Sequence, residues 1–262
     1  MKVEKISKRI YIDDEELKPI EWLKYGFSTR LLNGCEEQLG YNSTDKTEQV
    51  KKFAKVLFKK DIHIYIGDQV HKDNIQIIDD EEKWIKNGVN TPEIVQGVTI
   101  FPETDALILK KKNSAIGILT ADCLPILIVD VRNRVLALVH SGWKGTLLNI
   151  VGKCVNKMVE EIETKVEDLK VWIAPAIGVC CYEVGDEVLE QYKSQFAFHS
   201  KIIKGRNLDL VKAARLQFQV SGLKDTQIKS VDICTKCNSH IFYSHRAGNN
   251  KDGRNILLAG II

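Results

Sequence analysis

Two consecutive stretches decide the fold of this chain: Gly117-Ile-Leu-Thr-Ala-Asp-Cys-Leu-Pro-Ile-Leu-Ile-Val-Asp130, and then Arg134-Val-Leu-Ala-Leu-Val-His-Ser-Gly-Trp-Lys-Gly-Thr146. Their apolar, β-branched runs 116–121 and 135–139 are bounded by turn residues, which is typical of buried strands. The first run is followed by Asp122 and Cys123, and the second by His140. A lone buried cysteine is usually a small hydrophobe. The three polar residues together, at two strand ends, predict a functional site.

Other apolar runs predict further strands, among them 241–244, and these outnumber the predicted helices. We expect helices over Thr44–Phe58, over 146–166 with an amphipathic stripe, and after Asn207 as an N-cap. Strands and helices do not alternate strictly along the chain. The pattern therefore predicts an α+β fold, a sandwich of mixed β-sheets flanked by helices, with residues 1–262 forming a single domain.

Composition indicates an ordinary soluble protein. The chain has 262 residues, 44% hydrophobic and 28% charged, with a net charge of +3. So small a charge gives no argument for a nucleic-acid partner. No apolar run is long enough to predict a membrane span, and the charged first twenty residues do not resemble a signal peptide. The seven cysteines, an odd number, are expected to be reduced, which favours a cytoplasmic location. We expect a monomer.

Three candidate metal ligands each follow a strand-like run: His71, Cys123 and His140. All three can therefore meet at one edge of the sheets. Two histidines and one cysteine suit zinc with an open fourth position, where a bound water would have a pKa near neutrality. Asp122 could orient a ligand or act as a general base, and we count it with Cys123 and His140 as a catalytic candidate.

A second group of possible ligands consists of Cys234 and Cys237, separated by two residues, followed by His240 and His245. Only two residues lie between Cys237 and His240, whereas zinc fingers have about twelve or more there. The spacing argues against a finger, so we interpret Cys234 and Cys237 as structural or supporting residues.

Basic residues beside turns or glycines are candidates for anion binding: Arg30, Lys144, Arg246 and Arg254. Such positions suit recognition of phosphate or carboxylate. A surface salt bridge explains any one of them equally well, and the sequence leaves both readings open.

Six segments, in order along the chain, resemble motifs of the bacterial YfiH/YlmD family of laccase-domain proteins, also described as purine nucleoside phosphorylases or polyphenol oxidases. They are Gln69-Val-His71, Leu119-Thr-Ala-Asp-Cys-Leu-Pro125, His140-Ser-Gly-Trp-Lys-Gly145, Ala174-Pro-Ala-Ile-Gly178, Cys181-Tyr-Glu-Val-Gly185 and Phe242-Tyr-Ser-His-Arg246. The resemblance implies a sandwich of mixed sheets. It also implies a zinc site at His71, Cys123 and His140, the three residues already selected above.

The activity that this resemblance implies is phosphorolysis of adenosine, inosine, guanosine and methylthioadenosine, with adenosine deamination as a side activity. The partners are then a purine nucleoside and phosphate. Phosphorolysis needs cations that hold phosphate near the sugar, and deamination needs an activated water at the purine ring. We assign substrate binding to Arg30, Gln69, Lys144 and Arg246.

Three alternatives remain open at this point. Copper could replace zinc for phenol oxidation, because two histidines and a cysteine also form blue-copper sites. Cys123 could be the nucleophile of a Cys–His amidase acting on a peptidoglycan precursor, with His140 as its base. A non-enzymatic binding role is the last alternative.

Overall fold

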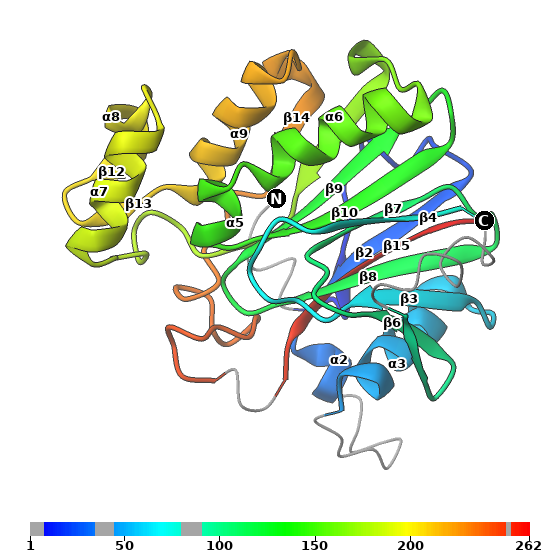
Figure 1. Ribbon diagram of the computed structural model, residues 1–262. Helices are drawn as coiled ribbons and strands as arrows, with labels where there is room; N and C mark the ends of the chain where they lie inside the picture. The colour runs from blue at the N-terminus through cyan, green and yellow to red at the C-terminus, as the bar shows by residue number, and fades with distance from the viewer. Residues whose placement is uncertain (1–7, 35–44, 80–90, 250–252) are drawn as a thin grey trace.

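The apolar runs of the central stretch form three strands, each buried on both faces: β8 (Ser114–Thr120), β9 (Leu124–Asp130) and β10 (Val135–Ser141). The computed structural model describes residues 8–34, 45–79, 91–249 and 253–262 (Figure 1). In β10, Leu136 and Leu138 face the core between two sheets, whereas Ala137 and Val139 face the core under the helices. Because successive side chains point to opposite faces and both faces are covered, these strands read as continuous apolar runs.

Two large sheets are packed face to face, and both are mixed. The seven-stranded sheet has the spatial order β1 (Tyr11–Ile12), β2 (Leu23–Ser28), β15 (Asn255–Ile261), β8, β3 (His63–Gly67), β6 (Val98–Phe101) and β5 (Glu93–Val95). The six-stranded sheet has the order β14 (Ile228–Ser230), β11 (Leu169–Ile173), β9, β10, β7 (Ala106–Leu109) and β4 (Ile75–Ile78). A small hairpin pairs β12 (Ile203–Lys204) with β13 (Asn207–Leu208).

Helices cover the outer face of each sheet, so the molecule has four layers (Figure 1). The six-stranded sheet is covered by α5 (Trp143–Leu147), α6 (Ile150–Ile162) and α9 (Leu210–Val220), with α7 (Asp186–Gln195) and α8 (His199–Ile202) at one end. The seven-stranded sheet is covered by α3 (Lys46–Phe58), near the short α2 (Leu31–Gly34). Two 3-10 turns, η1 (Val166–Asp168) and η2 (Asp225–Gln227), precede β11 and β14. The predicted sandwich of mixed sheets flanked by helices is confirmed.

Local interactions move two predicted helix boundaries. The helix expected over 146–166 is two helices, because Asn149 adopts a left-handed conformation with φ 58° between α5 and α6. The cap expected at Asn207 was wrong: Asn207 belongs to β13, and Asp209 is the N-cap of α9, accepting a hydrogen bond from the Lys212 N–H at 2.9 Å.

Two further predicted elements also differ from the structure. The helix expected from Thr44 begins at Lys46 and is capped by Asp45, while Thr44 lies outside the described residues. The strand expected over 241–244 was wrong. The N–H groups of Ile241 and Phe242 both turn back to the Asn238 carbonyl, at 2.8 and 3.0 Å, so they are not available to a sheet.

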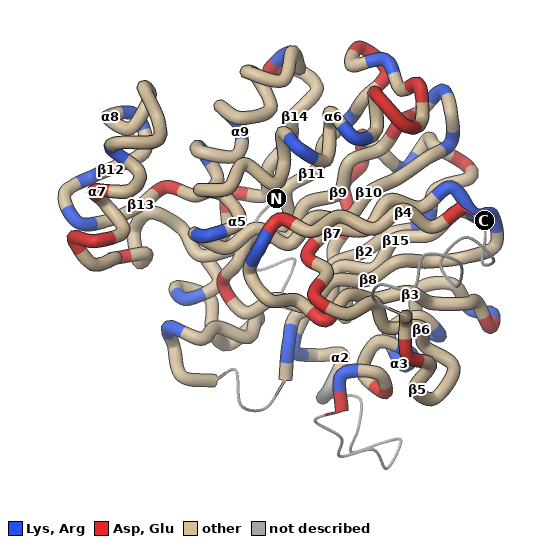
Figure 2. The backbone as a smooth tube through the Cα atoms, in the orientation of Figure 1, with Lys and Arg blue, Asp and Glu red and all other residues tan. Residues whose placement is uncertain are grey.

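Charged residues lie mostly on the helices and connections, while the strands through the middle of the molecule carry few of them (Figure 2). This distribution follows from the burial of both faces of the central strands, since an unpaired charge is costly to bury. Among the described residues, no helix combines the length and apolar character needed to cross a membrane.

The edge that carries the candidate site is set by strand direction. Strands β8, β3 and β6 are parallel neighbours, so their carboxyl ends lie at the same edge of the seven-stranded sheet. From each of these ends the chain crosses to the six-stranded sheet, into β9, β4 and β7 respectively. Three crossover connections therefore lie together at one edge of the sandwich.

Candidate metal centre

Each of the three crossovers carries a polar residue of the site. His71 lies between β3 and β4, Asp105 between β6 and β7, and Cys123 between β8 and β9. The fourth residue, His140, lies near the carboxyl end of β10, where Val139 pairs with Ala106 at the start of β7. His71, Cys123 and His140 therefore lie together at one edge of the sheets, as expected. The crossover connections bring them there.

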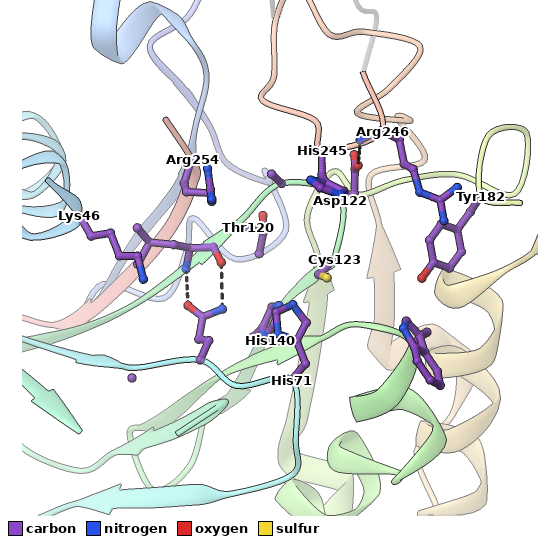
Figure 3. Close-up of a pocket in the computed structure, with 15 residues that line it drawn as sticks. Lys46, His71, Thr120, Asp122, Cys123, His140, Tyr182, His245, Arg246 and Arg254 are labelled. Carbon is purple, nitrogen blue, oxygen red and sulfur yellow. Dashed lines mark hydrogen bonds between the residues drawn. The ribbon is translucent and has the colours of Figure 1, made fainter. Parts of the chain in front are cut away.

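The three predicted ligands converge on one point. Their ligand atoms all lie within 4.8 Å of one another. The His71 and His140 rings meet edge to face, with centroids 4.8 Å apart and an interplanar angle of 80°. Figure 3 shows both imidazoles directed toward Cys123 from one side. Two imidazole nitrogens and one thiolate form a donor set that fits a zinc ion with one open position.

Asp105, which the sequence did not single out, organises this group. It is fully buried, and its carboxylate accepts hydrogen bonds from the His71 and Lys72 N–H groups at 3.0 and 2.8 Å. It also accepts one from Nδ1 of His140 at 2.8 Å. A carboxylate can only accept, so Nδ1 carries a proton, and Nε2 of His140 is the nitrogen that can bind a metal once its own proton has left.

Electrostatics within the group favour a charged thiolate and a charged imidazole. Burial alone would raise the pKa of the Cys123 thiol, but hydrogen bonds from His140 and His71 lower it to about 6. Burial alone would lower the pKa of His140, but its contacts with Asp105 and Cys123 raise it to about 9. Hydrogen bonds from His140 and the neighbouring backbone likewise hold the pKa of Asp105 below its usual value against the effect of burial.

Backbone geometry leaves space at the centre of the three ligands. A Cβ atom on Gly142 would lie 3.0 Å from Cys123 Sγ and 3.3 Å from His71 Cδ2, so a side chain there would displace the ligands. His71 and Asp122 adopt positive φ values of 62° and 97°. Such conformations are unfavourable for residues other than glycine and are found at functional sites. The donor set and this space together fit a bound metal.

The ligand group opens into a pocket of about 580 Å³. Of the predicted site residues, His71, Cys123, His140, Asp122, Gln69 and Arg246 line it. The other walls include the aromatic side chains of Trp143 and Tyr182 and the polar side chains of Lys46, His245 and Arg254. In Figure 3, Lys46 and Arg254 lie on the opposite side of the ligand group from Arg246 and Tyr182. The volume is within the range of small-molecule sites.

Two predicted site residues have their polar atoms engaged by the protein itself. Asp122 accepts a hydrogen bond from Thr235 Oγ1 at 2.6 Å through one oxygen, and from the Arg246 N–H at 2.8 Å through the other. The Gln69 amide exchanges two hydrogen bonds with the backbone of Leu119, at 2.8 and 2.9 Å. These contacts tie the loops of the pocket together.

The predicted cations divide between the pocket and the surface around it. Arg246 packs its guanidinium over the Tyr182 ring, 5.0 Å from the centroid, and donates to the Glu183 carbonyl at 2.8 Å. Arg30 does not line the pocket: it donates to the Ser239 carbonyl at 2.9 Å and lies over Tyr243. Lys144 is exposed and also lies outside the lining, with its Nζ 5.3 Å from the Trp143 ring centroid. The direction of each side chain determines whether it reaches the pocket, and the spacing of residues in the sequence does not reveal that direction.

The second group of possible ligands separates into two parts. His245 lines the pocket, and Cys234 and Cys237 lie instead beside Cys180 and Cys181. Within the described residues, neither His240 nor His245 belongs to that cysteine group. The rejection of a zinc-finger arrangement is consistent with this placement.

Comparison with known proteins gives one family match and several relatives. Residues 24–262 match the family model described as multi-copper polyphenol oxidoreductase laccase. The chain is 39% identical over 154 residues to a purine nucleoside phosphorylase of Clostridium acetobutylicum, covering 58% of this chain and 64% of that protein, so the match falls short of two thirds of the relative's length. It is 29% identical over 252 residues to a purine nucleoside phosphorylase of Bacteroides thetaiotaomicron, covering 90% of each.

A further relative and a solved structure extend the comparison. An adenosine deaminase from an unknown prokaryotic organism is 28% identical over 192 residues, which cover 71% of this chain and 70% of that protein. The crystal structure of the hypothetical protein YfiH from Bacillus licheniformis superposes with a TM-score of 0.78 at 24% identity, covering 96% of each chain. These findings agree with the resemblance drawn from the six motifs and with the mixed-sheet sandwich.

Proposed function

The chain belongs to the multi-copper polyphenol oxidoreductase laccase family, and from this and its named relatives we propose that it is a zinc-dependent purine nucleoside phosphorylase. The proposed substrates are adenosine, inosine, guanosine and methylthioadenosine, with phosphate as co-substrate. Deamination of adenosine is proposed as a side activity, in line with the relative named adenosine deaminase.

One observation carries the proposal: a single pocket joins the His71, Cys123 and His140 group to cationic and aromatic side chains. A nucleoside presents a flat base and a polar sugar, and phosphorolysis adds an anion. Tyr182 and Trp143 offer ring faces for the base, since stacking on aromatic side chains tolerates different purines. Arg246, beside Tyr182, can hold a phosphate through charge-assisted hydrogen bonds, and Arg254 adds positive charge on the opposite side of the pocket.

In phosphorolysis, a phosphate oxygen forms a bond to C1′ of the ribose while the bond from C1′ to N9 of the base breaks. The departing base takes the electron pair and must gain a proton. A zinc ion held by His71, Cys123 and His140 would supply Lewis-acid polarisation and a readily deprotonated water. Arg246 orients the phosphate, and Asp105 keeps Nε2 of His140 directed into the site.

Deamination uses the same base pocket but no phosphate. Water adds at C6 of the purine and ammonia leaves, so the cations have no anion to hold. The aromatic walls and the ligand group are then sufficient. The two reactions can therefore be separated by variants of the cations, although they share the ligand group.

Copper chemistry is a second candidate, favoured by the description of the family. The donor set of two histidines and a cysteine suits copper as well as zinc. A blue-copper site usually adds an axial methionine, and the only methionines are Met1 and Met158. Met158 belongs to α6, where it is buried in the core and does not line the pocket, which supports zinc over this type of copper site.

A Cys–His amidase is a third candidate, favoured by the contact of Cys123 with two imidazoles and by its pKa of about 6. A thiolate paired with an imidazolium is the reactive form in cysteine hydrolases. The same geometry makes Cys123 a good metal ligand. An acyl group trapped on Cys123 would favour this candidate, and tightly bound stoichiometric zinc would count against it.

The decisive experiment incubates metal-analysed protein with adenosine, with phosphate or with sulfate as a control anion, and identifies the products. We expect adenine and ribose 1-phosphate only with phosphate, and inosine with either anion. Chelation of the metal should stop both reactions. If neither product forms with stoichiometric zinc present, the proposal fails, and phenol oxidation by copper-loaded protein becomes the reaction to assay.

A further inference from the structure

Four cysteines from two distant segments come together outside the pocket: Cys180, Cys181, Cys234 and Cys237. Their four sulfur atoms all lie within 4.8 Å of one another. The Sγ atom of Cys237 is 3.4 Å from that of Cys181 and 3.7 Å from that of Cys180. The two pairs of cysteines are more than fifty residues apart in the sequence, so the fold has to bring them together. Such a cluster of thiols calls for a physical explanation.

The backbone holds the two segments in register. Ala176 and Cys234 form an isolated parallel bridge, and the Thr235 N–H donates to the Ala176 carbonyl at 3.0 Å. The Cys181 N–H donates to the Gly178 carbonyl at 2.9 Å, which turns the first pair of cysteines toward the second. A Cβ on Gly178 would lie 3.2 Å from Cys180 Sγ and from Cys234 Cβ, so glycine leaves room for the sulfurs.

The spacing of the sulfurs matches a shared metal better than disulfides. A disulfide places its sulfurs about 2.05 Å apart. A tetrahedral zinc site has Zn–S bonds of about 2.3 Å, which puts neighbouring sulfurs about 3.8 Å apart. The Cys181–Cys237 and Cys180–Cys237 separations of 3.4 and 3.7 Å lie near the second value. We propose that Cys180, Cys181, Cys234 and Cys237 bind one zinc ion as a tetrathiolate site, distinct from the ligand group in the pocket.

Hydrogen bonds around Cys234 support a thiolate ligand. Burial acts to raise the pKa of its thiol, but the nearby backbone N–H groups of Cys237 and Gly178 favour the charged form and help to lower the pKa. An N–H that points back to the first sulfur of a Cys-x2-Cys turn stabilises negative charge there and fixes the turn. Cys180 and Cys237 are exposed, so an ion can enter from solvent, and binding would release the thiol protons.

Four protein ligands leave no open position, so this zinc is structural. It would join two segments that form part of the pocket wall. Cys181 directly precedes Tyr182, and Cys234 directly precedes Thr235, whose hydroxyl donates to Asp122 at 2.6 Å. Arg246 already bridges the same region through the Glu183 carbonyl. The site thus clamps the wall that carries the Tyr182–Arg246 pair.

The test measures metal directly and does not depend on turnover. In Cys123→Ala protein, which lacks one pocket ligand, we expect one equivalent of zinc to remain after removal of loosely bound metal. Substitution of cobalt should then give the strong thiolate-to-metal charge-transfer absorption of a four-sulfur site. Adding Cys237→Ser to this background should abolish that spectrum and release the remaining zinc. Adding Cys154→Ala instead, which removes a buried core thiol, should change neither.

Loss of all metal from the Cys123→Ala protein, with its fold intact by circular dichroism, would overturn the proposal. So would retention of zinc and the cobalt spectrum in Cys123→Ala/Cys237→Ser protein. These outcomes are separate from failure of the proposed enzyme function, because no substrate is present. If the double variant does not fold, thiol labelling of wild-type protein decides the matter.

In zinc-loaded wild-type protein, a thiol reagent should leave the four cysteines unmodified, although two of them are exposed. A chelator should make them reactive, as identified by peptide mass spectrometry. Cys154 should stay unmodified in both states while the protein is folded, because burial raises its pKa to about 12. Immediate labelling of Cys180 and Cys237 in the zinc-loaded protein, or disulfides among the four cysteines in freshly purified protein, would overturn the proposal.

Discussion

Asp105 and His140 form a buried pair in which the imidazole Nδ1 donates to the carboxylate at 2.8 Å, and the two side chains are 0% and 3% exposed. The Asp105 carbonyl also accepts the His140 N–H at 2.8 Å. The side chain and the backbone carbonyl of Asp105 therefore both hold His140 in place. A carboxylate behind a ligating histidine sets its tautomer and raises its basicity, and its loss usually weakens metal binding.

Replacement Asp105→Asn should lower the affinity for zinc about 10- to 100-fold, because the amide cannot supply the negative charge that orients His140. Affinity is measured by competition with a chelator of known strength. Asp130→Asn is the matched control. Asp130 is also fully buried and accepts hydrogen bonds from the N–H groups of Arg132 and Asn133 at 3.0 and 2.9 Å, but it is the last residue of β9, just before the turn to β10. Equal affinities in the two variants would contradict the role of Asp105.

Replacement His140→Ala should reduce both base release and inosine formation about 100-fold or more, because a two-ligand site loses its metal. Both products are assayed side by side by chromatography. His199→Ala, in the short helix α8, should leave both rates unchanged. Normal base release from inosine by His140→Ala protein would show that the metal does not take part in phosphorolysis.

Replacement Arg246→Gln should raise the KM for phosphate about tenfold or more, because a charge-assisted hydrogen bond of about 1.5–3 kcal/mol is lost. Adenosine deamination should fall much less, since no anion is bound. Arg206→Gln is the control, because Arg206 pairs with Asp186 at 2.8 Å on the surface. Arg30→Gln tests the other predicted cation. A change in phosphate KM for Arg30 but not for Arg246 would reverse the assignment made here.

Replacement Gly142→Ala should weaken zinc binding while the protein still folds, because the new Cβ would press on Cys123 Sγ and His71 Cδ2. Zinc content and the melting temperature are measured on the same preparation. In Gly97→Ala the added Cβ meets nothing within 4 Å, but φ is +80°. That control should lose roughly 1–2 kcal/mol of unfolding free energy and no zinc. Unchanged zinc affinity in Gly142→Ala would show that the ligands do not need this space.

The ligand group was predictable because three chemically active residues follow apolar runs, and such runs must end at the edge of a sheet. Asp105 was not, because one aspartate before an apolar run looks like an ordinary strand start. Its role depends on β6 being parallel to β3, which is a long-range property. The direction of Arg30 and Lys144 depends on packing in the same way, and their turn-flanked positions could not distinguish the pocket from the surface.

Local structure was predictable where a single pattern dominates and not where a short-range interaction overrides it. The amphipathic stripe of 146–166 continues through Asn149, whose left-handed backbone divides the helix without disturbing the stripe. The apolar run 241–244 is buried, but the N–H groups of Ile241 and Phe242 donate to the Asn238 carbonyl, and the next two donate to asparagine side chains. Cys180 and Cys181 lie beside Cys234 and Cys237 because an isolated β-bridge joins two distant segments. No local sequence pattern reveals that bridge.

The three crossovers have a further consequence for the response of the protein to heat. His71 and Cys123 lie where the chain leaves one sheet for the other, and His140 lies on the second sheet. An ion held by all three would be linked thermodynamically to the separation of the two sheets, contributing about 4 kcal/mol when free zinc is a thousand times its dissociation constant. Shortening the side chain of Leu138, which lies in the core between the sheets, would then weaken the binding of an ion that this residue does not contact. The melting temperature would rise and fall with the zinc supply of its surroundings.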